Sequence, residues 1–336
     1  MKAELVHLAD KIINRPMMLL PDKLALAVSI LDGRIGIDGS GLMDGRPTPA
    51  ASRSSGNAKE SPHYRRAGDG VAIIPVIGSL VNRGGWLDAL SGVTSYTGLR
   101  TAINTAIQDE DISTVILDID SPGGEAVGAF EAADHIRDQG TKKPIVAWVD
   151  GLCCSAAYCI ASSTSRIVVT PSSVIGSIGV VSLHVDRSRR MDREGLTPTM
   201  IYAGAHKVDG NPLEPLSEEV KSDLQAEVDF FYEMFVARVA QGRPLLSANA
   251  IRATEARTFI GERAVAAGLV DAVGTLSQVI NELSALDRKS RSGPLGKYEL
   301  AARLHGDSQA LRLRVQDAHA AGRRAGMAAA MIEAKG

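Results

Sequence analysis

Between residues 71 and 286, short apolar runs bounded by turn residues alternate with segments whose apolar positions recur at helical spacing. The apolar runs predict buried strands, and the amphipathic segments predict helices that cover them. We expect strands at residues 71–77, 114–119, 145–149, 167–169, 175–181 and 199–202, and helices at 96–108, 125–137, 154–163, 187–194, 217–241, 248–256, 261–267 and 276–286. Such alternation predicts an α/β fold of parallel β-α-β units with helices on both faces.

The pattern changes on either side of this core. Residues 1–34 predict two short helices around Pro16 and Pro21, and residues 35–70 are rich in Gly, Ser, Pro and Arg, which predicts a flexible linker. Residues 287–336 begin as a basic linker and continue as an Ala- and Arg-rich helical tail. The organisation we expect is therefore an N-terminal helical segment (1–34), a linker (35–70), one large domain (71–286) and a helical tail (287–336).

Composition narrows the function classes. A net charge of −2 over 336 residues gives no indication of a nucleic-acid partner. No apolar run is long enough to span a membrane, and the N-terminus does not resemble a secretory signal. The three cysteines lie within seven positions with no His or acid at ligand spacing, so we expect neither disulfides nor a metal or organic cofactor. The odd count predicts a reducing, cytoplasmic setting.

A serine and a lysine are candidates for nucleophilic catalysis. Ser155 follows the apolar run 145–149 and a Gly turn, at the predicted start of a small-residue helix. This corner would present its hydroxyl, which needs a nearby base to become a nucleophile. Residues 201–205, which precede His206 and Lys207, are uncharged, and burial there would favour the neutral amine that can serve as the base.

Two turns complete the candidate site. Gly123 and Gly124 lie between a predicted strand and a predicted helix, so their N–H groups could hold a developing oxyanion. Ser177, in the turn Gly-Ser-Ile-Gly at 176–179, could hydrogen-bond to the lysine amine and position it. Together these groups supply the parts for acyl transfer by a Ser–Lys dyad.

The residues alone leave a second arrangement open. His206 or His184 could act as the general base with a carboxylate such as Asp120 or Asp150, in a Ser–His–Asp triad. His206 adjoins Lys207, and neighbouring side chains on a strand point to opposite faces. Only one of the two could then face Ser155, and the pattern does not choose between them.

The motifs jointly resemble a known family, the signal-peptide-peptidase-A type (S49) serine peptidases of the ClpP/crotonase fold. The resemblance covers residues 70–285 and rests on Asp-Ser-Pro-Gly-Gly at 120–124, Ser-Ala-Ala-Tyr at 155–158, Gly-Ser-Ile-Gly-Val at 176–180 and the Lys207 segment, in the family's order. It implies that Ser155 is the nucleophile and Lys207 the base, with Ser177 beside the lysine and Gly123 or Gly124 at the oxyanion hole. It favours Lys207 over His206 as the base.

One departure points to a branch of this family. Membrane-anchored members commonly carry Ser-Gly-Gly-Tyr where this chain has Ser-Ala-Ala-Tyr at 155–158, and they begin with a membrane segment. The chain is more similar to the bacteriophage and prophage branch, which implies cleavage of scaffold, capsid or portal proteins in the host cytoplasm or prohead. It also implies a homo-oligomer and a scaffold-like tail open to self-cleavage.

Two other functions fit the same sequence. A crotonase-fold acyl-CoA hydratase or hydrolase would use the glycine N–H groups without needing Ser155. A non-enzymatic assembly scaffold would retain the domain as a vestige. We expect the endopeptidase, with no cofactor and with proteins or peptides as substrates.

Overall fold

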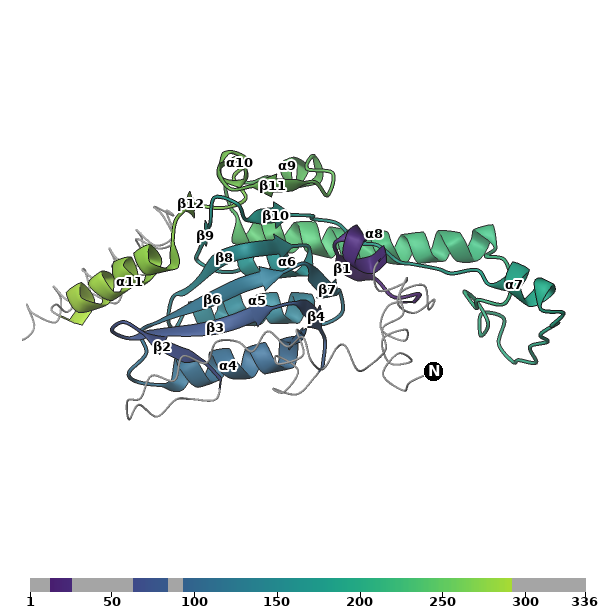
Figure 1. Cartoon of the computed structure of the whole chain (residues 1–336), viewed down its shortest axis with the longest axis horizontal. Coiled ribbons are helices and arrows are strands. Elements are labelled where there is room, and N and C mark those ends of the chain that lie inside the picture. The colour runs from purple at the N-terminus through teal and green to yellow at the C-terminus, as the bar shows by residue number, and fades with distance from the viewer. Residues whose placement is uncertain (1–12, 26–62, 84–92, 292–336) are drawn as a thin grey trace, which may run out of the picture.

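The structure is a computed structural model, and it describes residues 13–25, 63–83 and 93–291 (Figure 1). Its centre is an eight-stranded sheet in which β3, β6, β8, β9 and β10 run parallel, while β2 and β11 pair antiparallel at the edges. The strands are β2 (Arg65–Ala67), β3 (Val71–Ile77), β6 (Thr114–Ser121), β8 (Ile145–Cys154), β9 (Arg166–Val169), β10 (Val174–Gly176), β11 (Thr258–Ile260) and β12 (Ala272–Val273). The prediction of an α/β fold with a largely parallel sheet is confirmed.

Helices cover both faces of this sheet, because successive residues of its strands point to opposite sides. Ala72 and Ile74 face the main core, which also contains the apolar sides of α4 (Tyr96–Gln108), α5 (Ala129–Gly140), α6 (Ala156–Ser162) and α8 (Glu218–Gly242). Val71 and Ile73 face the other way, against Val279 and Leu283. Those two residues belong to α11 (Leu276–Arg291).

A second, smaller sheet stands beside the carboxyl end of β6. It has the order β1-β7-β4-β5, with β1 (Met17–Leu19), β4 (Ser79–Val81), β5 (Val93–Ser95) and β7 (Gly123–Glu125). Two predictions were wrong here. The helix expected from residue 125 begins at Ala129, after Gly128 in a left-handed conformation (φ 92°), and residues 123–125 are a strand. The stretch 17–19, expected to be helical, is also a strand, and helical backbone occurs at 21–25.

Other boundaries shift for reasons of pairing. β2 lies within the predicted linker 35–70, since its backbone pairs with β3. The expected strand at 199–202 is absent, because this stretch is exposed and has no strand to pair with among the described residues. The short helices are α7 (Ser188–Arg193), α9 (Ala248–Arg252) and α10 (Glu262–Ala266). Predictions for residues 1–12, 26–62 and 292–336 lie outside the described residues.

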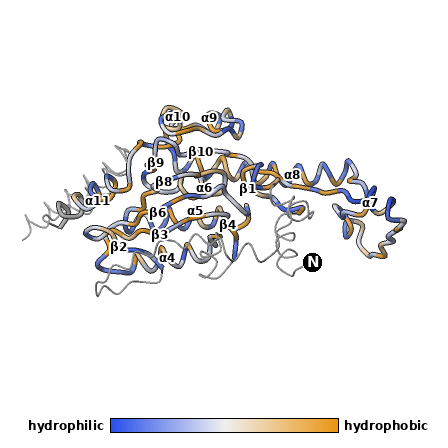
Figure 2. The backbone as a smooth tube through the Cα atoms, viewed as in Figure 1, coloured by the Kyte–Doolittle hydropathy of each residue, from blue (hydrophilic) through white to orange (hydrophobic). Residues whose placement is uncertain are grey.

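An extension projects from the body. It comprises α7, the segment 194–217 and the first half of α8, which runs away from the sheet (Figure 1). The buried residues of α8 lie only in its second half, and α7 has none. The hydropathy-coloured trace shows polar residues over much of this extension (Figure 2), but Leu196, Ile201, Tyr202 and Phe230 are exposed apolar side chains on it.

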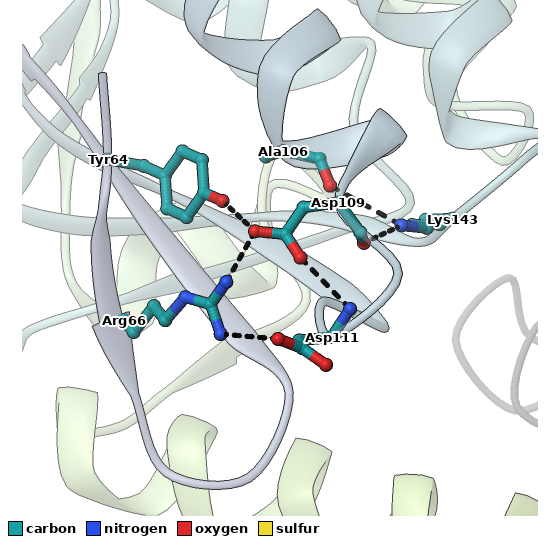
Figure 3. A network of polar contacts seen from close by, with 6 residues as sticks. All are labelled: Tyr64, Arg66, Ala106, Asp109, Asp111 and Lys143. Atoms are coloured by element: carbon teal, nitrogen blue, oxygen red, sulfur yellow. Dashed lines mark hydrogen bonds and ion pairs between the residues drawn. The ribbon is translucent and has the colours of Figure 1, made fainter. Parts of the chain in front are cut away.

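A polar network fastens the edge strand β2 to the body (Figure 3). The Tyr64 hydroxyl donates to the Asp109 carboxylate, and Arg66 pairs with Asp109 at 2.5 Å and with Asp111 at 3.1 Å. Lys143 donates to the main-chain oxygen of Asp109 at 2.6 Å. The end of α4 therefore holds both β2 and the segment that leads into β8.

Candidate active site

Ser155 occupies a sharp corner between β8 and α6. Its backbone has φ 56° and ψ −120°, a conformation that costs an L-residue free energy and persists only where the surroundings fix it. Here the Ser155 N–H donates to Gly176 O at 2.8 Å, and its carbonyl accepts from Cys159 N–H at 3.0 Å. Its side chain is buried, and the hydroxyl lies 3.4 Å from Gly179 O. The predicted strand-to-helix corner is confirmed.

Gly123 and Gly124 lie in β7 with main chain packed closely around them. A Cβ on Gly123 would overlap the Met18 carbonyl and stand 3.0 Å from both Ser155 Cβ and Cys154 O. A Cβ on Gly124 would overlap the backbone of Leu80. Both positions therefore require glycine because other chain segments approach so closely, and Gly123 lies directly beside Ser155.

The N–H groups of these glycines have partners in this conformation. The Gly123 N–H donates to Ser121 Oγ at 3.2 Å, and Ser121 Oγ in turn donates to Gly78 O at 2.7 Å. Gly124 lies opposite Met18 in the antiparallel pairing of β1 with β7. Ser121 was not among the residues selected from sequence, because a serine before Pro-Gly reads as an ordinary turn residue.

Ser177 follows Gly176, which accepts from the Ser155 N–H, and it lines a cavity. It has φ 52°, and its N–H donates to Arg257 O at 3.0 Å. The cavity has a volume of about 580 Å³ and borders Gly179, the residue whose carbonyl faces the Ser155 hydroxyl. It is lined by Leu19, Leu20, Pro21, Ser177, Gly179, Val180, Val181, Ala256, Arg257 and Thr258.

Lys207 is not brought to Ser155 within one chain. It lies exposed on the extension, where its N–H donates to Gly204 O at 3.0 Å, and its ammonium makes no hydrogen bond or ion pair with any described residue. The uncharged sequence before Lys207 suggested burial, but that stretch is itself exposed.

Neither candidate histidine contacts Ser155. His206 is exposed and pairs with Asp209 at 2.8 Å, and this carboxylate raises the pKa of His206 above its ordinary value. His184 Nδ1 lies 3.2 Å from the Asn14 side chain. Asp120, the carboxylate considered for a triad, accepts from the Leu152 N–H at 2.9 Å and so shapes β8.

The cysteines near the nucleophile are buried and unpaired with each other. Cys153, Cys154 and Cys159 are free thiols, and burial raises their pKa, to about 12 for Cys154 and Cys159. Across residues 13–25, 63–83 and 93–291, no three His, Cys, Asp or Glu side chains gather as ligands for a metal ion. Within those same ranges, no helix is both long and apolar enough to cross a membrane.

Comparison with known proteins decides the family. The model of peptidase family S49 matches residues 137–289. Capsid assembly protease C of Escherichia phage lambda is 34% identical over 298 residues, which cover 85% of this chain and 67% of that protein. This chain belongs to peptidase family S49. A second relative, head-tail preconnector protein GP5 of Enterobacteria phage P21, is 35% identical over 308 residues, or 88% of this chain and 60% of that protein.

Similarity extends to proteins outside phages. A putative signal peptide peptidase SppA of Enterococcus faecium is 29% identical over 194 residues, covering 56% of this S49 peptidase and 55% of the relative. The chain thus spans three fifths to two thirds of the two phage proteins, and about half of this bacterial one.

Proposed function

We propose that this S49 peptidase is a serine endopeptidase in which Ser155 is the nucleophile and Lys207 the general base. The observation that carries the proposal is the strained, buried corner at Ser155, with Gly123 immediately beside it. Residues 71–286 form the peptidase domain, and the parallel sheet with helices on both faces supports assignment to the ClpP/crotonase fold.

The proposed chemistry needs no group from outside the protein. Ser155 Oγ attacks the peptide carbonyl as its proton passes to the neutral amine of Lys207, and a tetrahedral oxyanion forms. N–H groups of Gly123 or Gly124 hold that oxyanion. Lys207 then protonates the leaving amine, and water hydrolyses the acyl-enzyme.

The exposure of Lys207 supports a site shared between subunits. A lysine acts as a base only after burial has lowered its pKa, and the extension cannot bury it alone. A neighbouring copy can bury it, because the extension that carries Lys207 also carries the exposed apolar side chains of Leu196, Ile201 and Tyr202. The amine would then reach Ser155 of the other subunit through the cavity at Ser177, whose hydroxyl would position it.

Phage head proteins are the proposed substrates. The basis is the name of the lambda relative, a capsid assembly protease, together with its similarity over most of this chain. We expect cleavage of scaffold, capsid or portal proteins in the host cytoplasm or prohead. We also expect cleavage of the chain's own tail. Membership of a peptidase family favours this activity over acyl-CoA chemistry.

Mixed subunits test the dyad directly. We expect Ser155→Ala and Lys207→Ala each to abolish self-cleavage, measured by mass spectrometry of the purified chain, and also cleavage of fluorescein-labelled casein. Unfolding and remixing the two inactive variants should restore part of the casein activity, because some sites then combine an intact serine with an intact lysine.

Matched controls separate the alternatives. Ser163→Ala at the C-cap of α6 and Lys221→Ala on the extension should retain activity, because these side chains bond to Arg137 and Glu218 and not to Ser155. Full activity in Lys207→Ala with loss in His206→Ala would overturn the dyad. Assembly without any proteolysis by the intact chain would favour the scaffold alternative.

A further inference from the structure

Strand β1 fills a groove beside the nucleophile. One edge pairs antiparallel with β7, with Met18 opposite Gly124 and Leu19 opposite Gly123. On the other edge Met17 exchanges two hydrogen bonds with Val181, at 2.8 and 2.9 Å. A strand of only three residues is therefore bonded along both sides, in a slot between β7 and the segment that follows the Gly-Ser-Ile-Gly turn.

The main chain of β1 lies over the reactive corner. A Cβ placed on Gly123 would overlap the Met18 carbonyl oxygen and would lie 3.0 Å from Ser155 Cβ. Met18 and Ser155 therefore both lie next to Gly123. A substrate carbonyl under attack must come within about 3–3.5 Å of the serine oxygen. Met18 leaves little room there, and both residues are at most 1% exposed.

β1 also accepts the hydrogen bond of the Gly124 N–H, a donor that the proposed oxyanion hole would use. Leu20 N–H donates to Pro122 O at 3.1 Å, and Ala126 N–H donates to Pro16 O at 3.3 Å. These bonds flank the Met18–Gly124 pair by two residues, so antiparallel alternation makes it a hydrogen-bonded pair. The Gly124 N–H is then directed at Met18, rather than at a substrate.

Most of the apolar contact of β1 lies outside the main core. Met17, Leu19 and Leu24 form a small cluster with Val181 and Leu183, and of the three residues of β1 only Met18 packs into the main core. Just before the strand, the Asn14 side chain donates to Gly210 O at 2.5 Å. Its carbonyl oxygen also lies 3.2 Å from His184 Nδ1. Through Gly210, the segment before β1 is therefore also bonded to the stretch that carries Lys207.

We propose that β1 is an intramolecular occupant of the substrate groove, and that an extended polypeptide binds antiparallel to β7 only after displacing it. This inference rests on the proposed function and adds its regulation. Strand addition supplies main-chain hydrogen bonds that any extended chain can make, so β1 and a substrate compete for the same edge. The chain as folded here is the closed form of the enzyme.

A disulfide can lock the closed form. Met17 and Val181 form a hydrogen-bonded antiparallel pair, whose Cα atoms stand about 5.5 Å apart, within the range a disulfide bridges. We expect oxidised Met17→Cys/Val181→Cys to cleave fluorescein-labelled casein at least tenfold more slowly than the same protein after dithiothreitol. Each single cysteine variant should be insensitive to oxidation, since the native thiols are buried with raised pKa.

Binding gives a readout that does not need catalysis. The probe is a fluorescent peptide with the sequence of residues 14–21, measured by anisotropy on the double-cysteine protein carrying Ser155→Ala. We expect at least tenfold tighter binding after reduction than before it. Equal binding in both states would overturn the occupant role of β1. Redox-gated binding without casein cleavage by any form would instead overturn the proposed function and leave the groove assignment standing.

A second variant opens the strand without a crosslink. Asn14→Gly keeps the residue's positive φ of 53° but removes the bonds to Gly210 and His184. It should bind the 14–21 peptide severalfold more tightly than the intact chain and exchange the Met17 amide faster with deuterium. Weaker peptide binding by Asn14→Gly would contradict the proposal and show that β1 is a permanent part of the site.

Discussion

At the scale of single residues, Ser155 is the position where the candidate site lowers the stability of the fold. Its φ of 56° and ψ of −120° suit glycine, yet a side chain stands there because the hydroxyl is needed. The bonds from its backbone to Gly176 and Cys159 hold it in place. Activity and stability therefore oppose each other at this position.

Replacing Ser155 by glycine tests that opposition. We expect Ser155→Gly to raise the free energy of unfolding by about 1 kcal/mol, because relief of a strained φ outweighs the loss of one long hydrogen bond. Ser155→Ala removes the same hydroxyl but keeps the strain, so it should not stabilise the protein. Urea denaturation of the three proteins measures the difference; equal stability of the two variants would argue against strain.

The sequence predicted the role of Ser155 as a corner but not the environment of Lys207. The corner follows from local signals, an apolar run, a glycine and small helix formers, and these survive in the structure. The burial of a lysine depends on what packs over it. Lys207 is exposed in the single chain, so no local pattern could specify its partner.

At the scale of elements, the errors in prediction share one cause. Residues 123–125 resemble the start of a helix, yet β4 and β1 pack against both sides of this glycine pair and make it a strand. β1 is a strand for the same reason, although the prolines at 16 and 21 suggested helix starts. Elements with a strong internal pattern, such as α4 and α8, were predicted to within a residue.

The network at β2 gives a prediction that depends on pH. Hydrogen bonding from Tyr64 and the nearby Arg66 lower the pKa of the Asp109 carboxyl. A lowered folded-state pKa adds stability above the unfolded-state value, about 3.9, and that stability is lost as pH falls through the folded-state pKa. Asp109→Asn should therefore cost about 1 kcal/mol at pH 6 and less at pH 3.

Denaturation at the two pH values checks this claim. Asp111→Asn is the matched control, because the Asp111 side chain is highly exposed and pairs only with Arg66, while its main-chain N–H still donates to Asp109, so it should change stability little at either pH. A cost for Asp109→Asn that stays the same from pH 6 to pH 3 would contradict the proposed role of its charge.

At the scale of the whole molecule, the extension exposes more apolar surface than an isolated chain would be expected to leave in water. Ile201 is 98% exposed, and Leu196, Tyr202 and Phe230 are each more than half exposed on the same projection. Apolar groups gathered on a surface mark an interaction site more often than isolated ones do. The shared active site proposed above gives this surface its partner, a second copy of the chain.

A single charge should disrupt that association. We expect Ile201→Asp to shift the protein towards the monomer in light scattering and to reduce casein cleavage at least tenfold, because Lys207 then stays in water. Leu245→Asp is the control: Leu245 is equally exposed at 98% but lies outside the extension. An unchanged mass for Ile201→Asp would place the interface elsewhere.

Helix α8 joins the two ends of this arrangement. Its 25 residues rise about 37 Å, from Glu218 on the projection to Gly242. Gly242 fits so closely against Ser162 that a methyl group on it would overlap the Ser162 carbonyl. Ser162 ends the helix that Ser155 begins. One continuous helix thus connects the projection to α6, the helix that holds the reactive hydroxyl. A partner that binds the outer end of α8 would therefore affect the position of α6 and of Ser155.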